Sequence, residues 1–385
     1  MTSRDSSGVL ALSNDDVREV FDMAACVELL EDGFEMLGEG EAVNPPRVDR
    51  SVERDPENFE GATEPTYYRL KTMTGASPEA GMVRIHSDIV HWPTRHGTTQ
   101  KEKLRATDDG QYVGFVLLFD TDTIEPYALI PDGYLQRMRV GGTSGVGTKH
   151  MAREDASVAG LFGSGWQAGA QILALCEVRD LQEIKVYSPT RGHREAFAAR
   201  FDERVEPTVR AVDSAAAAVE GSDVVHTATS SLDPVFDPDH LEPGTHVTCL
   251  GVHEVGAGTV ERADRIAQTW SDQTRLVDDG AGMREEVIET KTVENFVVGN
   301  PDEIPRFDKD EDALPDVDWA SLPGLADLIV DPETGRQREE EITLFLERGL
   351  GVQFLATGPY IYERAREQGL GTELPAGIFR QDLTP

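Results

Sequence analysis

The chain has 385 residues, which is enough for two domains that each bury a core. Its 36 basic and 71 acidic residues give a formal net charge of −35, which makes nucleic acid and anionic membranes poor partners. Because molar salt shortens the Debye length to about 3 Å and screens this self-repulsion, the charge predicts a protein adapted to a high-salt cytoplasm. An acidic protein that works at ordinary salinity is the alternative.

The cysteines and the hydropathy pattern indicate the cellular compartment in which the protein works. Cys26, Cys176 and Cys249 are isolated in apolar surroundings, which predicts buried thiols in a reducing compartment and no metal site. The N-terminus shows no basic segment followed by an apolar stretch, and no run is apolar and long enough to cross a bilayer. We therefore expect a soluble, cytoplasmic protein.

The N-terminal part predicts helices followed by antiparallel strands. Helices are expected over 14–21, capped by Asn14, and over 23–37, where apolar residues recur at helical spacing. The turn at 120–123 is expected to join two strands as a hairpin, and the polar segment 91–110 to form a surface loop. The expected strands are 67–71, 81–85, 112–119 and 127–130.

The pattern changes at residue 137. A helix of small residues over 137–151 is followed by alternating strands and helices, which predicts a parallel, doubly wound sheet. The expected strands are 158–162, 184–187, 223–229 and 246–250. The expected helices are 167–176, 191–201, 213–220 and 352–368.

The run 158–168 joins an apolar strand, the motif Gly-x-Gly-x-x-Ala and the start of a helix. Gly163 permits the tight turn, Gly165 lets the backbone approach a pyrophosphate, and Ala168 allows the helix to pack against the strand. Free N–H groups and the dipole at the helix start favour phosphate. This context favours a dinucleotide site over a purely structural turn. Its expected lining is Gly163, Ser164, Gly165, Trp166 and Gln167.

Further segments occur in an order that resembles the ornithine cyclodeaminase/μ-crystallin family over most of the chain. They are Pro46-Arg47, Lys71, 139–144, 162–168, 186–188, 243–248, 342–345 and 349–353. The resemblance implies an α/β fold with a central Rossmann-type doubly wound domain, residues 137–324. It also implies that this domain is inserted in an α+β substrate-binding and dimerisation domain, residues 1–136 and 325–385.

The family resemblance also implies chemistry. Members use a nicotinamide cofactor on amino and imino acids, and they share hydride transfer at a carbon that bears nitrogen and adjoins a carboxylate. An enzyme of this kind is expected, with ornithine cyclodeaminase, amino-acid dehydrogenase and ketimine reductase activities left open. A non-catalytic ligand-binding protein similar to μ-crystallin is the alternative.

The end of the second parallel strand bears on the choice between cofactors. Ser188, Thr190 and Arg191 stand where an NAD enzyme usually places an acid for the ribose 2′-hydroxyl. A hydroxyl and a guanidinium suit a 2′-phosphate, so NADP(H) is favoured and NAD(H) stays open. Thr227 and Thr229, at the end of the third strand, are expected to line the nicotinamide side or to form a plain polar turn.

Cationic side chains are expected to hold the substrate carboxylate. The resemblance places Arg47, Lys71 and Arg139 on the substrate side, and Arg has the geometry to bind two carboxylate oxygens. A desolvated Lys71 is also a candidate acid or base. An interdomain salt bridge is the alternative role for Arg139. Arg84 is a further candidate, although alternating strands usually direct charges outward.

Two departures from the family pattern concern the site. Family cyclodeaminases carry an aspartate after the strand that corresponds to 246–250, where this chain has His253 and Glu254. Either is a candidate general acid or base, with a surface pair as the alternative, and the change puts ornithine cyclisation in doubt. Val140 replaces a threonine found in many relatives, so Thr143 and Ser144 are the expected hydroxyl donors to a phosphate.

Overall fold

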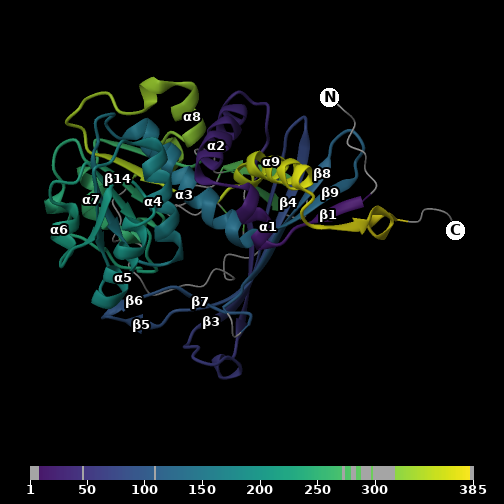
Figure 1. Ribbon diagram of the computed structural model, residues 1–385, viewed down its shortest axis with the longest axis horizontal. Helices are drawn as coiled ribbons and strands as arrows, with labels where there is room; N and C mark the ends of the chain where they lie inside the picture. Colours follow the sequence, from purple (N-terminus) through teal and green to yellow (C-terminus); the bar gives the residue numbers. More distant parts are fainter. Residues whose placement is uncertain are drawn as a thin grey trace.

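Two β-sheets form most of the fold, and a long helix lies between them. The computed structural model describes residues 8–45, 47–107, 110–270, 274–278, 283–287, 296–297 and 317–381. Helix α3 (Asp132–Met151) contacts strand β8 (Val113–Asp120) of one sheet and strand β19 (Thr343–Leu346) of the other. Figure 1 shows α3 near the centre, between strands β4 and β8 on one side and β14 on the other.

The larger sheet is mainly antiparallel and has nine strands among the described residues. The turn between β8 and β9 forms the expected hairpin. The sheet order, starting from one edge, is β18 (Phe296–Val297), β2 (Arg47–Arg54), β3 (Thr66–Ala76), β4 (Ala80–His91), β8, β9 (Pro126–Pro131), β1 (Gly8–Ala11) and β20 (Thr372–Pro375), with β7 (Glu102–Leu104) beside β4.

The second sheet is parallel and seven-stranded. Its winding reverses between β10 and β13, because β11 and β12 lie on one side of β10 and the later strands on the other. Ligands of open α/β sheets bind at this kind of reversal, outside the carboxyl ends of the strands. The order is β12 (Thr208–Ala211), β11 (Glu183–Tyr187), β10 (Val158–Phe162), β13 (Val224–Thr227), β14 (His246–Cys249), β19 and β15 (Arg265–Gln268).

The remaining elements cover the sheets. Strands β16 (Thr274–Asp278) and β17 (Met283–Val287) pair with each other. The other helices are α1 (Asn14–Val20), α2 (Met23–Gly38), α4 (Trp166–Val178), α5 (Arg191–Asp202), α6 (Ala215–Val219), α7 (Gly256–Arg262), α8 (Leu325–Val330) and α9 (Val352–Gln368).

Local sequence explains where the helices begin and how they pack. Ser13 caps α1 through the Asp16 N–H, one residue earlier than the expected Asn14 cap. Helix α3 begins at Asp132 rather than at 137 and tolerates close packing because it is rich in glycine. A Cβ at Gly141 would lie 2.6 Å from the Ala170 carbonyl oxygen of α4, so only glycine permits this approach.

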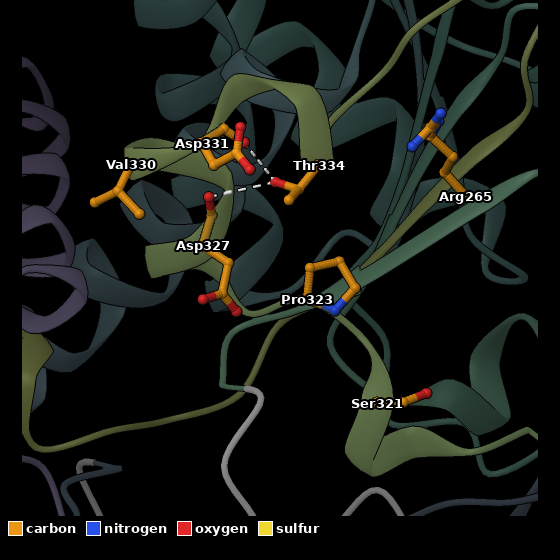
Figure 2. Close-up of a pocket in the computed structure, with 7 residues that line it drawn as sticks. All are labelled: Arg265, Ser321, Pro323, Asp327, Val330, Asp331 and Thr334. Carbon is orange, nitrogen blue, oxygen red and sulfur yellow. Dashed lines mark hydrogen bonds between the residues drawn. The ribbon is translucent and has the colours of Figure 1, made fainter.

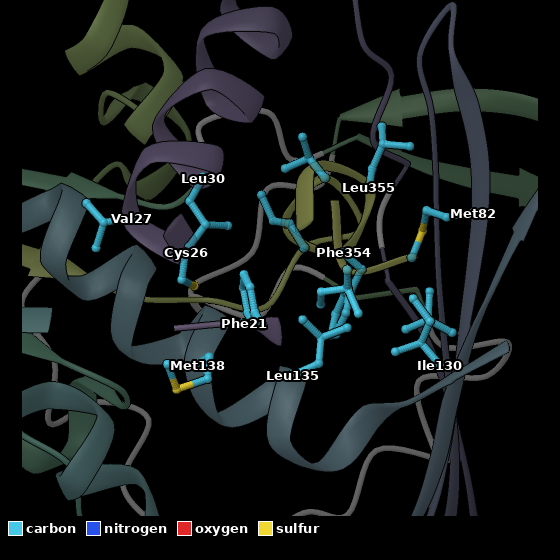
Figure 3. Close-up of a cluster of buried hydrophobic side chains, with 14 of the residues drawn as sticks. Phe21, Cys26, Val27, Leu30, Met82, Ile130, Leu135, Met138, Phe354 and Leu355 are labelled. Atoms are coloured by element: carbon cyan, nitrogen blue, oxygen red, sulfur yellow. The ribbon is translucent and has the colours of Figure 1, made fainter. Parts of the chain in front are cut away.

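A continuous apolar core joins the helices to the larger sheet. Phe21, Leu30 and Phe354 are at most 1% exposed and pack in one cluster (Figure 3). Cys26 and Cys249 are fully buried and Cys176 is partly buried, and burial raises the pKa of each thiol. All three cysteines are free, as expected.

Two segments differ from the expectations. The segment 91–110 is not simply a loop, because β7 pairs with β4 and a hairpin forms from β5 (Thr94–Arg95) and β6 (Thr98–Thr99). The expected domain boundaries stay a prediction. Within them, Thr343–Leu346 of the outer segment 325–385 is a strand of the parallel sheet, since its backbone pairs with β14 and β15.

Candidate functional site

The glycine turn after β10 has the geometry of a dinucleotide site. Gly163 adopts a φ of 116°, and a Cβ there would lie 2.4 Å from the Ala228 carbonyl oxygen. A Cβ on Gly165 would meet no atom within 4 Å among the described residues, so this part of the turn faces open space. No side chain of the described residues caps the first turn of α4, which leaves its N–H groups for an anion. The turn therefore fits a bound pyrophosphate.

Some of the other expected cofactor residues lie in the glycine turn, at the start of α4 and in the loop after β11. Ser164 and Ser188 lie with their hydroxyl oxygens 3.0 Å apart, which links the glycine turn to the end of β11. Thr190 lies in the same loop, and Arg191 is exposed and paired with Glu195. Trp166 is half exposed at the start of α4, beside the partly buried Gln167.

The expected hydroxyl donors of α3 and of β13 are buried in this conformation. The Thr143 hydroxyl donates to the Arg139 carbonyl and accepts from the Gln353 amide. Ser144 is fully buried and its hydroxyl has no partner among the described residues. Thr227 is 1% exposed. Contact of these hydroxyls with a phosphate or nicotinamide stays a prediction, and it requires a rearrangement at Thr143.

A group of charged residues lies on one face of the larger sheet, on strands β3 and β4. Alternate residues of β3 and β4 share a face, so Lys71 of β3 lies 2.9 Å from Asp88 of β4. The Asp132 carboxylate of α3 lies 2.5 Å from Arg84 and 2.7 Å from His86. We call the set the β3–β4 charge cluster: Arg69, Lys71, Arg84, His86, Asp88, Lys103 and Asp132.

The β3–β4 charge cluster is cationic, although the whole chain is strongly acidic. It contains four Lys or Arg residues against two carboxylates, and six of its seven members are at most 9% exposed. Such a site attracts the carboxylate of a small substrate. Burial and the neighbouring charges of Arg69 and Lys103 lower the pKa of Lys71 well below its ordinary value. The Lys71 ammonium therefore gives up its proton more readily than that of an exposed lysine.

The carboxylates of the cluster stay ionised. Burial opposes ionisation of Asp88, but the His86 hydrogen bond and the Lys71 charge outweigh it, and the pKa lies well below its ordinary range. Burial likewise opposes ionisation of Asp132, yet the Arg84 charge and the His86 hydrogen bond lower its pKa. Both aspartates thus serve as fixed negative charges that hold the cations in place.

Arg139 lies between this cluster and the carboxyl edge of the parallel sheet. Its Nη1 lies 3.3 Å from Glu347, which follows β19, and donates to the Gln353 amide oxygen at 2.9 Å. Arg139 is 4% exposed, and burial lowers its pKa to about 10, so it stays protonated at neutral pH. The pair with Glu347 matches the salt-bridge alternative, while the Arg139 Nε has no partner among the described residues. The Arg47 guanidinium donates two hydrogen bonds to the Asp49 carboxylate, from Nε at 2.8 Å and from Nη2 at 3.0 Å.

The two candidates after β14 differ in environment. His253 is exposed, whereas Glu254 is 2% exposed and burial raises its pKa. One Glu254 oxygen accepts from the N–H and hydroxyl of Thr229, at 2.6 and 2.7 Å, and the other accepts from the Gly251 N–H. Glu254 therefore fastens the loops after β13 and β14 to each other. A catalytic role for either residue stays a prediction.

Several residues of the site were not anticipated from the sequence. His86, Asp88 and Lys103 were not singled out, although the alternation Arg84-x-His86-x-Asp88 in an otherwise strand-like run was a usable signal. Glu347 follows β19 and carried no local signal, because its partner Arg139 is far away in the sequence.

Two surface pockets among the described residues lie apart from the expected site residues. A surface pocket of about 440 Å³ is lined by α8 and its neighbours and contains none of the expected site residues (Figure 2). Its Thr334 hydroxyl is already bonded to the Asp327 and Asp331 carbonyls. The described part of the chain contains no cluster suited to a metal ion. None of its helices is both long and apolar enough to cross a membrane.

Comparison with known proteins agrees with this geometry. The profile of the ornithine cyclodeaminase/mu-crystallin family matches residues 98–369. The chain belongs to this family. It is 28% identical over 269 residues to a delta(1)-pyrroline-2-carboxylate reductase of Bacillus cereus, covering 68% of this chain and 74% of the reductase. It is 24% identical over 369 residues to the alanine dehydrogenase of Archaeoglobus fulgidus, covering 95% of this chain and 98% of that enzyme.

Solved structures show the same fold. The delta(1)-pyrroline-2-carboxylate reductase of Thermococcus litoralis, in complex with NADH and L-proline, superposes with a TM-score of 0.71 at 26% identity, covering 95% of this chain and 100% of the other. An archaeal alanine dehydrogenase dimer with bound NAD gives a TM-score of 0.69 at 22% identity, covering 95% and 98%. The Rossmann-type fold and the use of a nicotinamide cofactor, both expected from the sequence, are confirmed.

Proposed function

We propose that this protein is a nicotinamide-dependent reductase of a small imino acid, of the type of Δ1-pyrroline-2-carboxylate, and that it oxidises the matching amino acid in reverse. The observation that carries the proposal is the buried cationic β3–β4 charge cluster, which Arg139 connects to the carboxyl edge of the parallel sheet. We place the substrate carboxylate on these cations and the cofactor at the glycine turn, outside the carboxyl ends of the parallel strands.

Each part of the site has a task in this reaction. The cofactor, when bound, supplies or accepts the hydride. Arg47 and Arg139 bind the substrate carboxylate after Arg47 exchanges Asp49 for substrate. Lys71 holds the proton that the substrate nitrogen gains on reduction, because burial and the neighbouring cations lower its pKa and make the ammonium a better proton donor. Asp88 keeps the Lys71 amine oriented.

Reduction is favoured over cyclodeamination. The position of the family's aspartate is taken by an exposed His253, and both oxygens of the neighbouring Glu254 are engaged by backbone N–H groups. The chain therefore lacks a free buried carboxylate at that point to take a proton from an amine during cyclisation. We propose hydride transfer to an imine as the complete reaction.

The cofactor and the assembly complete the proposal. We propose NADP(H) as the preferred cofactor, because Ser188, Thr190 and Arg191 supply donors and no acid at the ribose end. A homodimer in a high-salt cytoplasm is also proposed, from the family resemblance and the charge of −35. Light scattering in molar salt tests the dimer.

A substrate panel tests the function. Purified protein in molar salt is mixed with NADPH or NADH and cyclic imino acids of different ring size, and loss of the reduced cofactor is followed by absorbance. L-ornithine with the oxidised cofactor is assayed for ammonia release. Turnover of an imino acid without ammonia release from ornithine supports the proposal, and binding of cofactor without any turnover supports a non-catalytic protein instead.

Lys71→Met is the residue-level test of this mechanism. The variant is expected to lower kcat by about 10²-fold or more, the usual effect of losing a general acid. Lys149→Met is the matched control, because Lys149 is a partly exposed lysine that pairs with Glu31 away from the cluster. Equal activity of both variants would remove Lys71 from the mechanism.

A further inference from the structure

The β5–β6 hairpin connects the larger sheet with the loops around the glycine turn. Its chain leaves β4 at His91 and returns to the sheet at β7. Between these points it leaves the sheet, and Figure 1 shows β5 and β6 beside α5 of the parallel-sheet layer. The sequence predicts only a polar surface loop here.

Backbone hydrogen bonds fix the hairpin on the loop that follows β13. The Leu232 N–H donates to the Thr99 carbonyl at 2.9 Å, and the Lys101 N–H donates to the Ser230 carbonyl at 2.9 Å. The Thr99 N–H also donates to the Asp233 carboxylate at 3.2 Å. This ladder specifies one position of the hairpin against the parallel-sheet layer.

The tip of the hairpin reaches the loop on the other side of the glycine turn. The His96 Nε2 lies 3.5 Å from the Thr190 hydroxyl, in the loop after β11. Because β10 lies between β11 and β13, contacts with both neighbouring loops place the hairpin across the end of β10, where Gly163–Gly165 lies. The span fits: two strand spacings are about 10 Å, and the four residues from His96 to Gln100 reach at most about 14 Å.

His96 occupies the first position of the two-residue turn between β5 and β6. His96 and Gly97 both have positive φ, 52° and 81°, as a two-residue hairpin turn requires. Asn-Gly is the favoured pair for such a turn, and histidine is, with Asn and Asp, among the non-glycine residues that adopt positive φ most often. The turn therefore accommodates His96, and its imidazole lies beside Thr190, where the sequence lacks the acid that binds a ribose 2′-hydroxyl.

We propose that the β5–β6 hairpin is part of the cofactor site and that His96, together with Thr190, binds the 2′-phosphate of a phosphorylated dinucleotide. This assignment rests on the proposed function, since it requires a dinucleotide at the glycine turn. It gives the larger sheet a direct contact with the adenosine end of the cofactor. The ring donates a hydrogen bond to a phosphate oxygen, and the Ser188 hydroxyl of the same loop as Thr190 lies 3.0 Å from the Ser164 hydroxyl of the glycine turn.

The test compares affinities for NADPH and NADH in molar salt, measured by energy transfer from tryptophan, with calorimetry as a second readout. His96→Asn removes the imidazole and keeps the turn, since Asn-Gly suits the positive φ values. His240→Asn is the matched control, because His240 is a half-exposed histidine that pairs with Glu220 away from the glycine turn. Thr190→Ala and the His96→Asn/Thr190→Ala double variant complete a double-mutant cycle, which measures the coupling between the two side chains.

We expect His96→Asn to weaken NADPH binding about tenfold or more, the scale of a hydrogen bond to a charged group, while NADH affinity changes less than about twofold. The effects of His96→Asn and Thr190→Ala are expected to be non-additive. An unchanged ratio of NADPH to NADH affinity in His96→Asn overturns the assignment and leaves the proposed function standing. A wild-type protein that binds NADH alone overturns the assignment and the proposed NADP(H) preference, and it leaves the proposed imino acid reduction standing. A wild-type protein that binds neither nucleotide overturns both the assignment and the proposed function.

Discussion

Buried His226 predicts that acid destabilises this protein within a defined pH window. Its ring nitrogens lie 2.9 Å from the Thr148 hydroxyl and 2.8 Å from the Gln171 amide oxygen, inside the parallel-sheet layer. The side chain is fully buried, and burial lowers its pKa from 6.5 to about 3. The folded protein therefore keeps His226 neutral while the unfolded chain takes up a proton below pH 6.5.

The magnitude follows from the two pKa values. The contribution of His226 to stability is fully present above pH 6.5 and is lost as pH falls toward 3. At about pH 5 the loss amounts to about 2 kcal/mol, from 1.36 kcal/mol per pKa unit. Burial of His246 lowers its pKa as well and adds a loss in the same direction.

Urea unfolding in molar salt at about pH 8 and about pH 5 measures this loss. His226→Gln removes the titrating ring, so its free energy of unfolding is expected to fall about 2 kcal/mol less than that of the wild type over this interval. His246 is present in both proteins, and only the part of its pKa shift that comes from the His226 charge differs between them. His240→Gln is the control, because this histidine lies near the surface, and it is expected to keep the wild-type fall. The reasoning is refuted if His226→Gln retains the full pH dependence.

Three further predictions concern the glycine turn, the buried ion pair and the charge. Gly165→Ala is expected to keep the wild-type thermal stability and to weaken nucleotide binding about tenfold. Gly163→Ala is expected to destabilise the protein itself, because its Cβ would lie 2.4 Å from the Ala228 carbonyl oxygen. Calorimetry measures the nucleotide affinity and thermal unfolding the stability, and together they show whether the two effects separate. Arg139→Ala is expected to lower the free energy of unfolding by about 3–5 kcal/mol, because it leaves Glu347 buried without its partner. Adding Glu347→Gln is expected to restore part of this loss, and urea unfolding that finds the double variant no more stable than Arg139→Ala would contradict the reasoning. Reducing the salt from molar to about 0.1 M is expected to lower Tm, since the charge of −35 is then poorly screened, and an unchanged Tm speaks against salt adaptation.

The sequence predicted those features that depend on neighbouring residues. The glycine turn follows from the six consecutive positions 163–168, at the junction of a strand and a helix, and the structure confirms β10, the turn and α4. The helix expected over 352–368 matches α9, because its apolar spacing is continuous. The parallel sheet follows from alternating strands and helices, although the membership of Thr343–Leu346 does not, since a short buried strand shows no periodicity of its own.

Contacts between distant segments were decided only by the tertiary structure. Arg84 was a further candidate for the substrate side, with the outward direction usual for strand charges as the alternative, and the fold buries it beside Asp132 of α3. Arg139 was expected to bind substrate, and the fold adds Glu347 as a partner from the far end of the chain.

The sequence by itself therefore determined the family, the dinucleotide turn, the acidic surface and most helices and strands, because each is encoded by local spacing or by composition. The tertiary structure alone decided which cations share a buried face, which carboxylates keep them charged, and where the β5–β6 hairpin lies. Those outcomes depend on strand register and on chain crossings between sheets, and the free energy of pairing buried charges appears only once the partners meet.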